Sequence, residues 1–450
     1  MFVFDIYPYM MFDFRFGEPS RLPLPRISQT HYAFAQMRAL TRTHGKDLGF
    51  WVGTYNPAWY RPFLCPELQA MHWTEREMSM TAVAAGANYL LTGYNIPVDA
   101  GHWESFGKGL QLIQKAGGRL LAAPKVKAKA CMLFPRSHYI QLQEEYFDVG
   151  LSFELFLRAF GELDILHEDQ IKDDQLDGYA LLVMFDVKLL PREVAERIVS
   201  FVRRGGVVLA DCVPQLDADL QPMTVMAELF GVAKAETDRI RRSGCWVPYK
   251  AQAPIWFARP ENAPDESQYK TDTLKADENT GGTLPLKDVT LVSPRACTVT
   301  DGEVPVRTAS GLPALVHRRL GNGHAYLLGF CVQDTYFKTW QDQDAAARAQ
   351  LRALMAAVPQ GAGIRPHVHS SNPDIEASIR ANAQEGYLFV INHEAQSPET
   401  VVRLADIGFP VKQTIDLENG NPMECTVEGG VATLNLSVPL GEAKILRILP

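Results

Sequence analysis

The sequence predicts an α/β fold in three parts: part of a (β/α) barrel, a doubly wound α/β domain and a C-terminal all-β sandwich. Three observations support this prediction. Short apolar runs alternate with amphipathic runs over residues 1–122, the same alternation recurs over 129–212, and seven short alternating runs follow residue 367. Continuous apolar runs are typical of parallel strands buried on both faces, whereas strict alternation is typical of strands with one buried face.

Length and composition limit the possible classes of function. A chain of 450 residues with 46% hydrophobic and 21% charged residues has room for several globular domains. The net charge of −8, without a basic stripe, argues against nucleic acid or an anionic membrane as partner. The seven cysteines are scattered and never in CxxC spacing, which favours a reducing, cytoplasmic compartment. No apolar run reaches the ~20 residues of a membrane-spanning helix.

The first part, residues 1–122, is predicted to contain three βα units. Its expected strands are 1–8, 47–56 and 88–95, and its expected helices are 31–45, 74–87 and 104–118. Long aromatic loops after the strands are typical of a (β/α) barrel, but a whole barrel needs about eight units over ~250 residues. The sequence therefore predicts the C-terminal part of a barrel.

The second part, residues 123–366, is predicted to begin with a polar hinge at 123–128 and to continue as strand, helix, strand, helix, strand up to Cys212. The runs expected to be helical are 152–171 and 191–204, where Pro191 suits a first helical turn and Gly205-Gly206 ends the helix. This alternation is typical of a doubly wound α/β unit.

The rest of the second part is less regular. A short helix is expected over 224–232, followed by a β-rich insertion at about 236–311. Two apolar runs around Gly321-Asn322-Gly323 predict a hairpin. A helix over 342–358 should begin at Asp342 or Asp344.

The third part, residues 367–450, should be a β-sandwich, because seven short strands recur there at about ten-residue spacing with turn residues between them. The expected strands are 375–382, 386–394, 400–406, 413–419, 423–429, 431–438 and 443–449.

Aromatic and polar side chains at the carboxyl ends of the barrel strands form the candidate binding site, since barrel enzymes bind substrates at that edge. An aromatic ring combines an apolar face with a polar tip, which suits a sugar. Packing of the loops over the barrel mouth is the alternative. The candidate substrate-binding residues are Asp5, Tyr7, Tyr55, Trp59, Trp73, Tyr94, Asn95, Trp103 and Glu104.

A glycosidase needs two carboxyl groups at the scissile bond. Glu67 and Glu104 are the loop carboxylates available, although each alone is more often a solvated surface residue. Glu67 is the candidate catalytic residue.

Three other features resemble reactive sites but lack an essential part. Cys212 ends an apolar run but has neither a G-x-C-x-G turn nor a matching histidine downstream, so a buried thiol is expected. His367 and His369 lack a third ligand at metal-site spacing. The glycine pairs match no phosphate-binding loop. No metal or cofactor is therefore predicted.

In the order of its parts the sequence resembles the C-terminal two-thirds of glycoside hydrolase family 42 β-galactosidases. The stretches that carry the resemblance are FDIYP, AAGANYLLTGYN, CMLFPRSHY, YALLVMFDVKLL, FVRRGGVVLADC, GNGHAYLLGF and GYLFVINHE. The resemblance covers nearly the whole chain and lies in order and pattern more than in one motif. It implies a partial (β/α)8 barrel, a flavodoxin- or amidotransferase-like trimerisation domain without amidotransferase activity, and a small C-terminal β-domain.

The departures from the family pattern concern catalysis. In that family the acid/base Glu follows an Asn, and this sequence has no Asn-Glu pair. The nucleophile follows the penultimate barrel strand, so it corresponds to Thr54 if that strand is 48–55, or to Glu67 if it is 62–69. We expect a truncated or split β-galactosidase-like hydrolase whose barrel is completed by another chain or an absent segment. A catalytically inactive carbohydrate-binding or assembly protein is the alternative, and thiol chemistry at Cys212 is a third.

Overall fold

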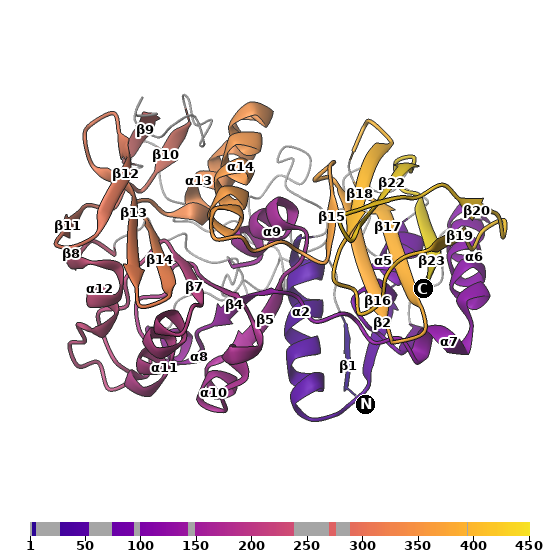
Figure 1. Ribbon diagram of the computed structural model, residues 1–450, viewed down its shortest axis with the longest axis horizontal. Coiled ribbons are helices and arrows are strands. Elements are labelled where there is room, and N and C mark those ends of the chain that lie inside the picture. Colours follow the sequence, from indigo (N-terminus) through magenta and orange to yellow (C-terminus); the bar gives the residue numbers. More distant parts are fainter. Residues whose placement is uncertain are drawn as a thin grey trace, which may run out of the picture. The chain divides into compact units, whose positions relative to one another are not determined.

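The computed structural model describes residues 2–5, 28–53, 74–93, 100–142, 149–237, 270–275, 289–393 and 395–450. These residues form two compact units (Figure 1). The first unit holds the described residues up to 128 together with those from 366 onward, and the second holds those of 129–365. The fold is mixed α/β, with a central parallel sheet and C-terminal all-β strands, as the sequence predicts.

The N-terminal part of the first unit contains three parallel strands in the order β1-β2-β3. These are β1 (Phe2–Asp5), β2 (Leu48–Gly53) and β3 (Tyr89–Gly93), and the helices are α2 (Ser28–Thr43), α5 (Thr74–Ala84), α6 (Ala100–Ala116) and α7 (Gly118–Leu121). Phe34, Phe50, Met78 and Phe106 pack together between helices and sheet. The βα rhythm predicted from the sequence is confirmed for these residues.

The C-terminal part of the first unit is a sandwich of two antiparallel sheets. One sheet has the order β15 (Val368–Ser370), β18 (Glu399–Leu404), β22 (Val431–Ser437), β21 (Thr426–Glu428). The other has the order β16 (Ile375–Ala381), β17 (Gly386–Asn392), β23 (Ala443–Leu449), β19 (Gln413–Asp416), β20 (Pro422–Met423). Every expected strand is present, and the run 423–429 is divided between β20 and β21.

Strand β17 is buried on both faces. Leu388 and Val390 point into the sandwich core. Tyr387, Phe389 and Ile391 point the other way and pack with side chains of α5 and α6, which lie beside this sheet (Figure 1). Burial of each such side chain contributes roughly 1.5–3 kcal/mol to stability. The sandwich therefore shares a core with the barrel helices.

Strand β16 carries polar side chains on the face that meets α5. Ile375, Ala377 and Ile379 belong to the sandwich core, whereas the alternate positions Glu376 and Arg380 point outward. Arg380 is 1% exposed, and its guanidinium donates to carbonyl oxygens at the end of α5 and in the following chain. Its acceptors are Val83 O at 3.0 Å, Ala87 O at 3.0 Å, Ala123 O at 2.7 Å and Asn88 Oδ1 at 3.1 Å.

The segment 123–128, expected from the sequence to be a polar hinge, lies along the edge of β16. Val126 N donates to Ile379 O at 3.2 Å, and Ala381 N donates to Pro124 O at 2.9 Å. These backbone bonds cover an edge strand that would otherwise expose unpaired groups. The segment is thus paired with the sandwich, and the boundary between the two units falls directly after it, between Ala128 and Lys129. Its role as a hinge stays a prediction.

The second unit is built on a nine-stranded sheet with the order β10-β9-β12-β13-β14-β7-β6-β4-β5. The parallel strands are β4 (Ala130–Phe134), β5 (Asp164–His167), β6 (Leu181–Met184), β7 (Val207–Ala210) and β14 (Gly323–Leu328). The antiparallel extension consists of β13 (Pro313–Leu320), β12 (Glu303–Thr308), β9 (Thr271–Lys275) and β10 (Thr290–Val292). A separate pair joins β8 (Val232–Ala235) to β11 (Cys297–Val299).

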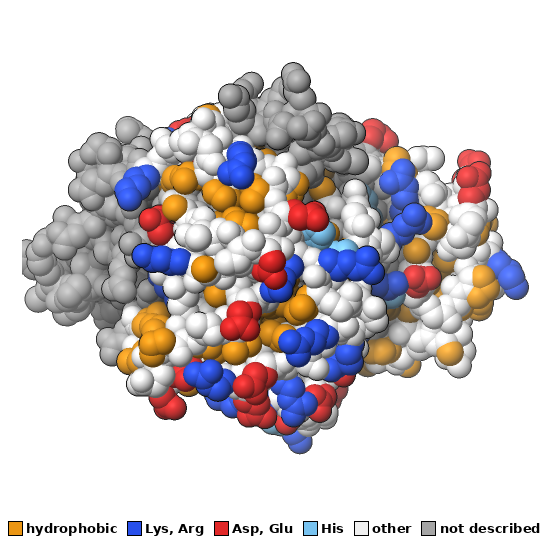
Figure 2. Space-filling model, turned by 60° about the vertical axis from the view of Figure 1, so that its left-hand side comes forward, with side chains coloured by type: hydrophobic (Ala, Val, Ile, Leu, Met, Phe, Trp, Pro, Cys, Tyr) orange, Lys and Arg blue, Asp and Glu red, His pale blue; other side chains and the backbone are white. Residues whose placement is uncertain are grey.

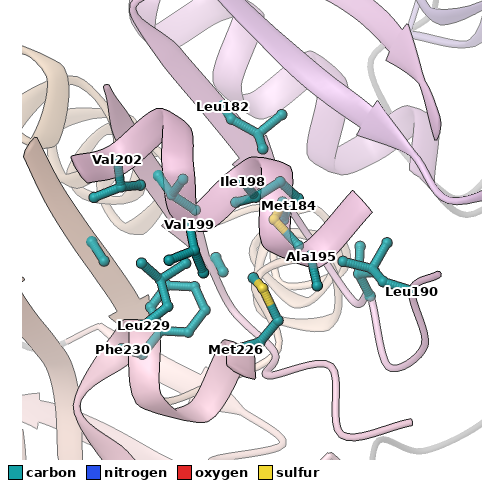
Figure 3. Close-up of a cluster of buried hydrophobic side chains, with 14 of the residues drawn as sticks. Leu182, Met184, Leu190, Ala195, Ile198, Val199, Val202, Met226, Leu229 and Phe230 are labelled. Carbon is teal, nitrogen blue, oxygen red and sulfur yellow. The ribbon is translucent and has the colours of Figure 1, made fainter. Parts of the chain in front are cut away.

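Helices lie on the faces of this sheet. They are α8 (Arg136–Leu142), α9 (Val149–Phe160), α10 (Glu168–Lys172), α11 (Arg192–Arg203), α12 (Val225–Phe230), α13 (Val332–Gln341) and α14 (Ala345–Gly361), with a 3₁₀ turn at Gln175–Gly178. Figure 3 shows side chains of α11 and α12, among them Ile198 and Phe230, packed with Leu182 and Met184 of β6. This core has the doubly wound arrangement that the sequence predicts.

One predicted helix of the second unit was wrong. The run 152–171 was expected to be a single helix, but α9 ends at Phe160, Gly161 has φ 102°, and Asp164–His167 forms β5. A strand of four residues is too short to show a period of its own, so its apolar side chains extended the helical pattern. The hairpin β13–β14 and the helix cap at Asp344, whose carboxylate accepts from Ala347 N at 2.9 Å, are confirmed.

The surface shows charges of both signs. On the face drawn in Figure 2, basic and acidic side chains are interspersed and neither sign dominates. Among the described helices none is long and apolar enough to cross a membrane.

We expect Arg380→Ala to lower the free energy of unfolding by about 3 kcal/mol or more, because it leaves several buried carbonyl oxygens without a donor. Urea unfolding followed by circular dichroism measures this change. Arg403→Ala is the matched control, since Arg403 lies exposed on β18 of the same sandwich. Equal stability of the two variants would show that the Arg380 contacts contribute nothing specific.

Candidate functional site

The three barrel strands end at one common edge. Asp5 is the last residue of β1, and the parallel registers pair Asp5 with Trp51 and Gly53 with Gly93. The loops that follow the three strands therefore leave from the same side of the sheet. This is the edge at which the candidate sugar site is predicted.

Most of the predicted site residues lie outside the described part of the chain. These are Tyr7, Tyr55, Trp59, Glu67, Trp73, Tyr94 and Asn95. Their roles, including that of Glu67 as the catalytic carboxylate, stay predictions.

Trp103 and Glu104 lie near the start of α6, which begins at Ala100. Trp103 is 51% exposed, and its ring centroid is 6.5 Å from that of Phe106. The Glu104 carboxylate lies 2.8 Å from Lys108 Nζ one turn away, and the hydrogen bond and charge of Lys108 lower the pKa of Glu104. Such a carboxylate stays ionised and can accept hydrogen bonds from hydroxyl groups, but it is not held in the protonated form that a general acid needs. Contact of either residue with a sugar stays a prediction.

Cys212 of the second unit is buried and surrounded by charged groups at the carboxyl ends of β6 and β7. Arg295, 3% exposed, lies 2.6 Å from Asp186 Oδ1 and 3.3 Å from Asp211 Oδ1. Burial raises the pKa of the Cys212 thiol to about 12. A nucleophilic cysteine needs the opposite shift and an open approach, so this thiol is structural.

Asp211 holds the same region together. Its Oδ1 accepts from Asp186 N at 2.6 Å, and its Oδ2 accepts from Val332 N at 2.9 Å, in the first turn of α13. A carboxylate at a helix N-terminus satisfies amide groups that have no partner within the helix. The strand end that could have carried amidotransferase-type chemistry is therefore occupied by a buried ion-pair network.

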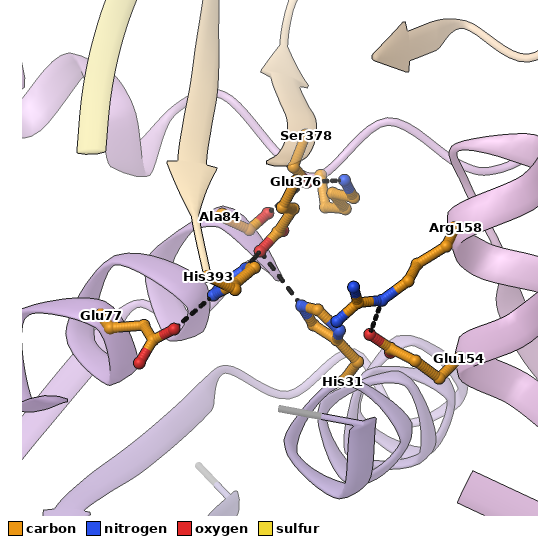
Figure 4. A network of polar contacts seen from close by, with 9 residues as sticks. His31, Glu77, Ala84, Glu154, Arg158, Glu376, Ser378 and His393 are labelled. Carbon is orange, nitrogen blue, oxygen red and sulfur yellow. Dashed lines mark hydrogen bonds and ion pairs between the residues drawn. The ribbon is translucent and has the colours of Figure 1, made fainter. Parts of the chain in front are cut away.

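A second polar cluster, in the first unit, was not found from the sequence. It consists of His31 of α2, Glu77 of α5, Glu376 of β16 and His393 just after β17 (Figure 4). Glu376 Oε2 lies 3.1 Å from His31 Nε2 and 3.0 Å from His393 Nε2. On its other nitrogen, His393 Nδ1 lies 2.6 Å from Glu77 Oε1. We call these four residues the His-Glu cluster.

The His-Glu cluster is largely buried, so its charged groups strongly affect one another's pKa. The side chains of His393 and Glu77 are 2% and 1% exposed, and that of Glu376 is 14% exposed. Burial alone would raise the pKa of Glu376, but the charges and hydrogen bonds of His31 and His393 bring it well below its usual range. Burial alone would lower the pKa of His393, but its hydrogen bonds to Glu376 and Glu77 raise it. The cluster therefore favours a cationic group between the carboxylates.

Sequence spacing gave no sign of this cluster, because His31 and Glu376 are 345 positions apart. The histidine pair considered from the sequence, His367 and His369, lies elsewhere: His367 Nδ1 is 3.2 Å from Ala405 O, and His369 lies in β15. The one sequence feature near the cluster was the alternation of polar and apolar residues in β16, which normally indicates a strand with one face toward solvent.

Comparison with known proteins gives a consistent picture. Residues 141–248 match the family model described as the GLMA-like second domain. The exo-β-D-glucosaminidase of Pyrococcus horikoshii is 22% identical over 269 residues, which is 60% of this chain and 29% of that protein. The enzyme of the same name from Thermococcus kodakarensis is 24% identical over 53% of this chain and 25% of its own. The chain thus spans less than a third of the length of these relatives.

Solved structures resemble the chain over nearly its whole length. The β-galactosidase of Bacillus circulans sp. alkalophilus superposes with a TM-score of 0.63 at 16% identity, covering 99% of this chain and 60% of that one. The β-galactosidase of Rahnella sp. R3 gives 0.66 at 14% identity, with 99% and 60% coverage. The family 42 β-galactosidase Gan42B of G. stearothermophilus gives 0.64 at 13% identity, with 100% and 59% coverage. The chain has the fold of the matching part of these proteins, about 60% of their length, and the resemblance stated from its sequence is confirmed.

We expect Cys212 to resist alkylation in the native protein. With a pKa of about 12, roughly 10⁻⁴ of the thiol is ionised at pH 8. Iodoacetamide labelling followed by peptide mass spectrometry should modify the half-buried Cys425 much faster, and Cys212 only after denaturation. Native labelling of Cys212 as fast as that of Cys425 would restore the case for thiol chemistry.

Proposed function

We propose that the chain is a relative of β-galactosidase-type glycoside hydrolases and that its barrel edge binds a carbohydrate. The observation that supports this most strongly is the fold match to β-galactosidases over 99% or more of the chain. The weak sequence similarity to two exo-β-D-glucosaminidases points to the same reaction class, hydrolysis of an O-glycosyl bond. The aromatic residues predicted at the barrel edge would stack on sugar rings.

Hydrolysis by this chain requires a second carboxyl group and a more complete barrel. In a retaining mechanism two carboxyl groups lie about 5–5.5 Å apart on either side of the bond that breaks. Glu67 is our candidate for the nucleophile, and the sequence has no Asn-Glu pair to supply the acid/base residue. The described residues up to 128 contain three βα units, which is less than half of the eight in a barrel. We propose that the chain is active only when further barrel strands, from other segments or a partner chain, complete the site.

A catalytically inactive carbohydrate-binding or assembly protein is the second candidate. It is favoured by the missing Asn-Glu pair and by the engagement of Glu104 with the surface residue Lys108. In this case the aromatic residues would hold a sugar without turnover.

The oligomeric state and the cellular compartment are proposed from the sequence. We propose that the α/β domain, residues 123–366, carries the contacts of a homo-oligomer, a trimer by its resemblance to family 42. The cysteine pattern suggests a reducing, cytoplasmic compartment. No cofactor is needed for the proposed chemistry.

We expect the purified chain to bind methyl β-galactoside or β-glucosamine saturably without hydrolysing nitrophenyl β-glycosides. Trp59→Ala or Trp103→Ala should weaken binding by about 5- to 10-fold, the effect of one lost stacking contact. Isothermal titration calorimetry measures this affinity. Tyr89→Ala is the matched control, because Tyr89 is 49% exposed but lies at the opposite, amino end of β3.

Two results would contradict this account in different ways. Enzyme-like turnover by the chain alone, abolished by Glu67→Gln, would overturn the need for further barrel strands. Absence of binding to every sugar tested would overturn the carbohydrate site itself.

A further inference from the structure

We propose that His31, Glu376 and His393 form a binding site for one divalent transition-metal ion of the zinc type, independent of the proposed glycoside chemistry. The three ligand atoms, one from each residue, all lie within 4.8 Å of one another. They come from α2, β16 and the end of β17, three segments of the first unit that are far apart in sequence. The ion would tie the barrel helices to the sandwich.

The two distances from the Glu376 carboxylate suit a shared ion. Glu376 Oε2 is 3.1 Å from one imidazole nitrogen and 3.0 Å from the other. Two atoms at this separation subtend roughly 90° at an ion ~2.1 Å from each, and widening by a few tenths of an ångström gives the tetrahedral angle. The two imidazole rings lie edge to face, with centroids 5.4 Å apart, so their edges converge on the carboxylate (Figure 4).

Glu77 decides which nitrogen of His393 can bind the ion. Its Oε1 lies 2.6 Å from His393 Nδ1, and an ionised carboxylate only accepts hydrogen bonds, so Nδ1 carries the proton. In a neutral imidazole this leaves a lone pair on Nε2, which points at Glu376 Oε2 3.0 Å away. Two lone pairs that face each other need a cation between them. A carboxylate on the far nitrogen of a ligating histidine is the usual support of a metal site.

The donor set selects the class of ion. Two imidazoles and one carboxylate suit zinc, cobalt or nickel, whereas magnesium and calcium prefer oxygen ligands alone. Water would fill the fourth position, because the side chains of Glu376 and His31 are 14% and 9% exposed. The competing occupant is a proton, which would make His393 a buried imidazolium between Glu77 and Glu376.

The experiment uses the full chain, stripped with a chelator and titrated with CoCl₂ or ZnCl₂. We expect one equivalent of Co²⁺ with visible d–d absorption, Zn²⁺ binding with a Kd of about 1 µM or tighter, and a rise in melting temperature. His31→Gln or His393→Gln should weaken binding about 100-fold or more, and Glu77→Gln about 10-fold or more. His369→Gln, in β15 outside the His-Glu cluster, is the control and should bind as the parent does.

X-ray absorption at the zinc edge of the unmodified protein gives a readout that needs no variant, and it should show two imidazole nitrogens in the first shell. A folded chain that retains no equivalent of Zn²⁺ or Co²⁺ would overturn the proposal, and the cluster would then be held by protons. Undiminished binding by a folded His31→Gln/His393→Gln double variant would overturn it as well. Because no measurement involves a sugar, the metal site and the proposed function fail or stand separately.

Discussion

The first unit depends on the burial of one polar strand face. In an isolated sandwich the outward side chains of β16, Glu376, Ser378 and Arg380, would face water. Here Arg380 donates to carbonyls around the end of α5, Ser378 Oγ lies 3.4 Å from Ala84 O, and Glu376 belongs to the His-Glu cluster beside the start of the same helix. Unpaired polar groups are costly to bury, so these partners make the packing specific as well as tight.

The same contact explains why the two ends of the chain form one compact unit. On the sheet face shared with Arg380, Tyr387 and Phe389 of β17 add apolar surface against α5 and α6. The segment 123–128 then completes the contact by pairing with the edge of β16. The C-terminal sandwich therefore covers the outer face of the helices of the partial barrel. The polar contacts fix the position of the sandwich strands against these helices.

The sequence predicted an element correctly where the signal for that element lies within its own residues. The strands of the sandwich, the hairpin around Gly321-Asn322-Gly323 and the cap at Asp344 were predicted because their signals are local. Strand β5 was missed because four residues after Gly161 cannot be distinguished from the end of a helix. The outward face of β16 was missed because alternation reveals that a face is polar but not what covers it.

The candidate sites show the same limit. Strand-end positions such as Asp5 follow from the parallel registers, so the edge of the predicted sugar site could be derived from the pattern. The His-Glu cluster could not, because its members come from both ends of the chain and no spacing rule links them. Cys212 was predicted in part. The missing motif predicted an inert thiol, but the network of Asp186, Arg295 and Asp211 around it is visible only in the structure.

The central claim is that α5 and strands β16 and β17 are held together by one shared core and by the Arg380 contacts, and it implies that they open and close as one cooperative unit. Hydrogen exchange of the backbone amides of α5, measured by mass spectrometry in Phe389→Ala and in the parent, tests it most directly. Loss of the buried Phe389 ring should lower the protection of α5 as much as that of β17, by about 3 kcal/mol or more of opening free energy. Unchanged protection of α5 beside a weakened β17 would show that the helices and the sandwich are stable independently, and would contradict the account.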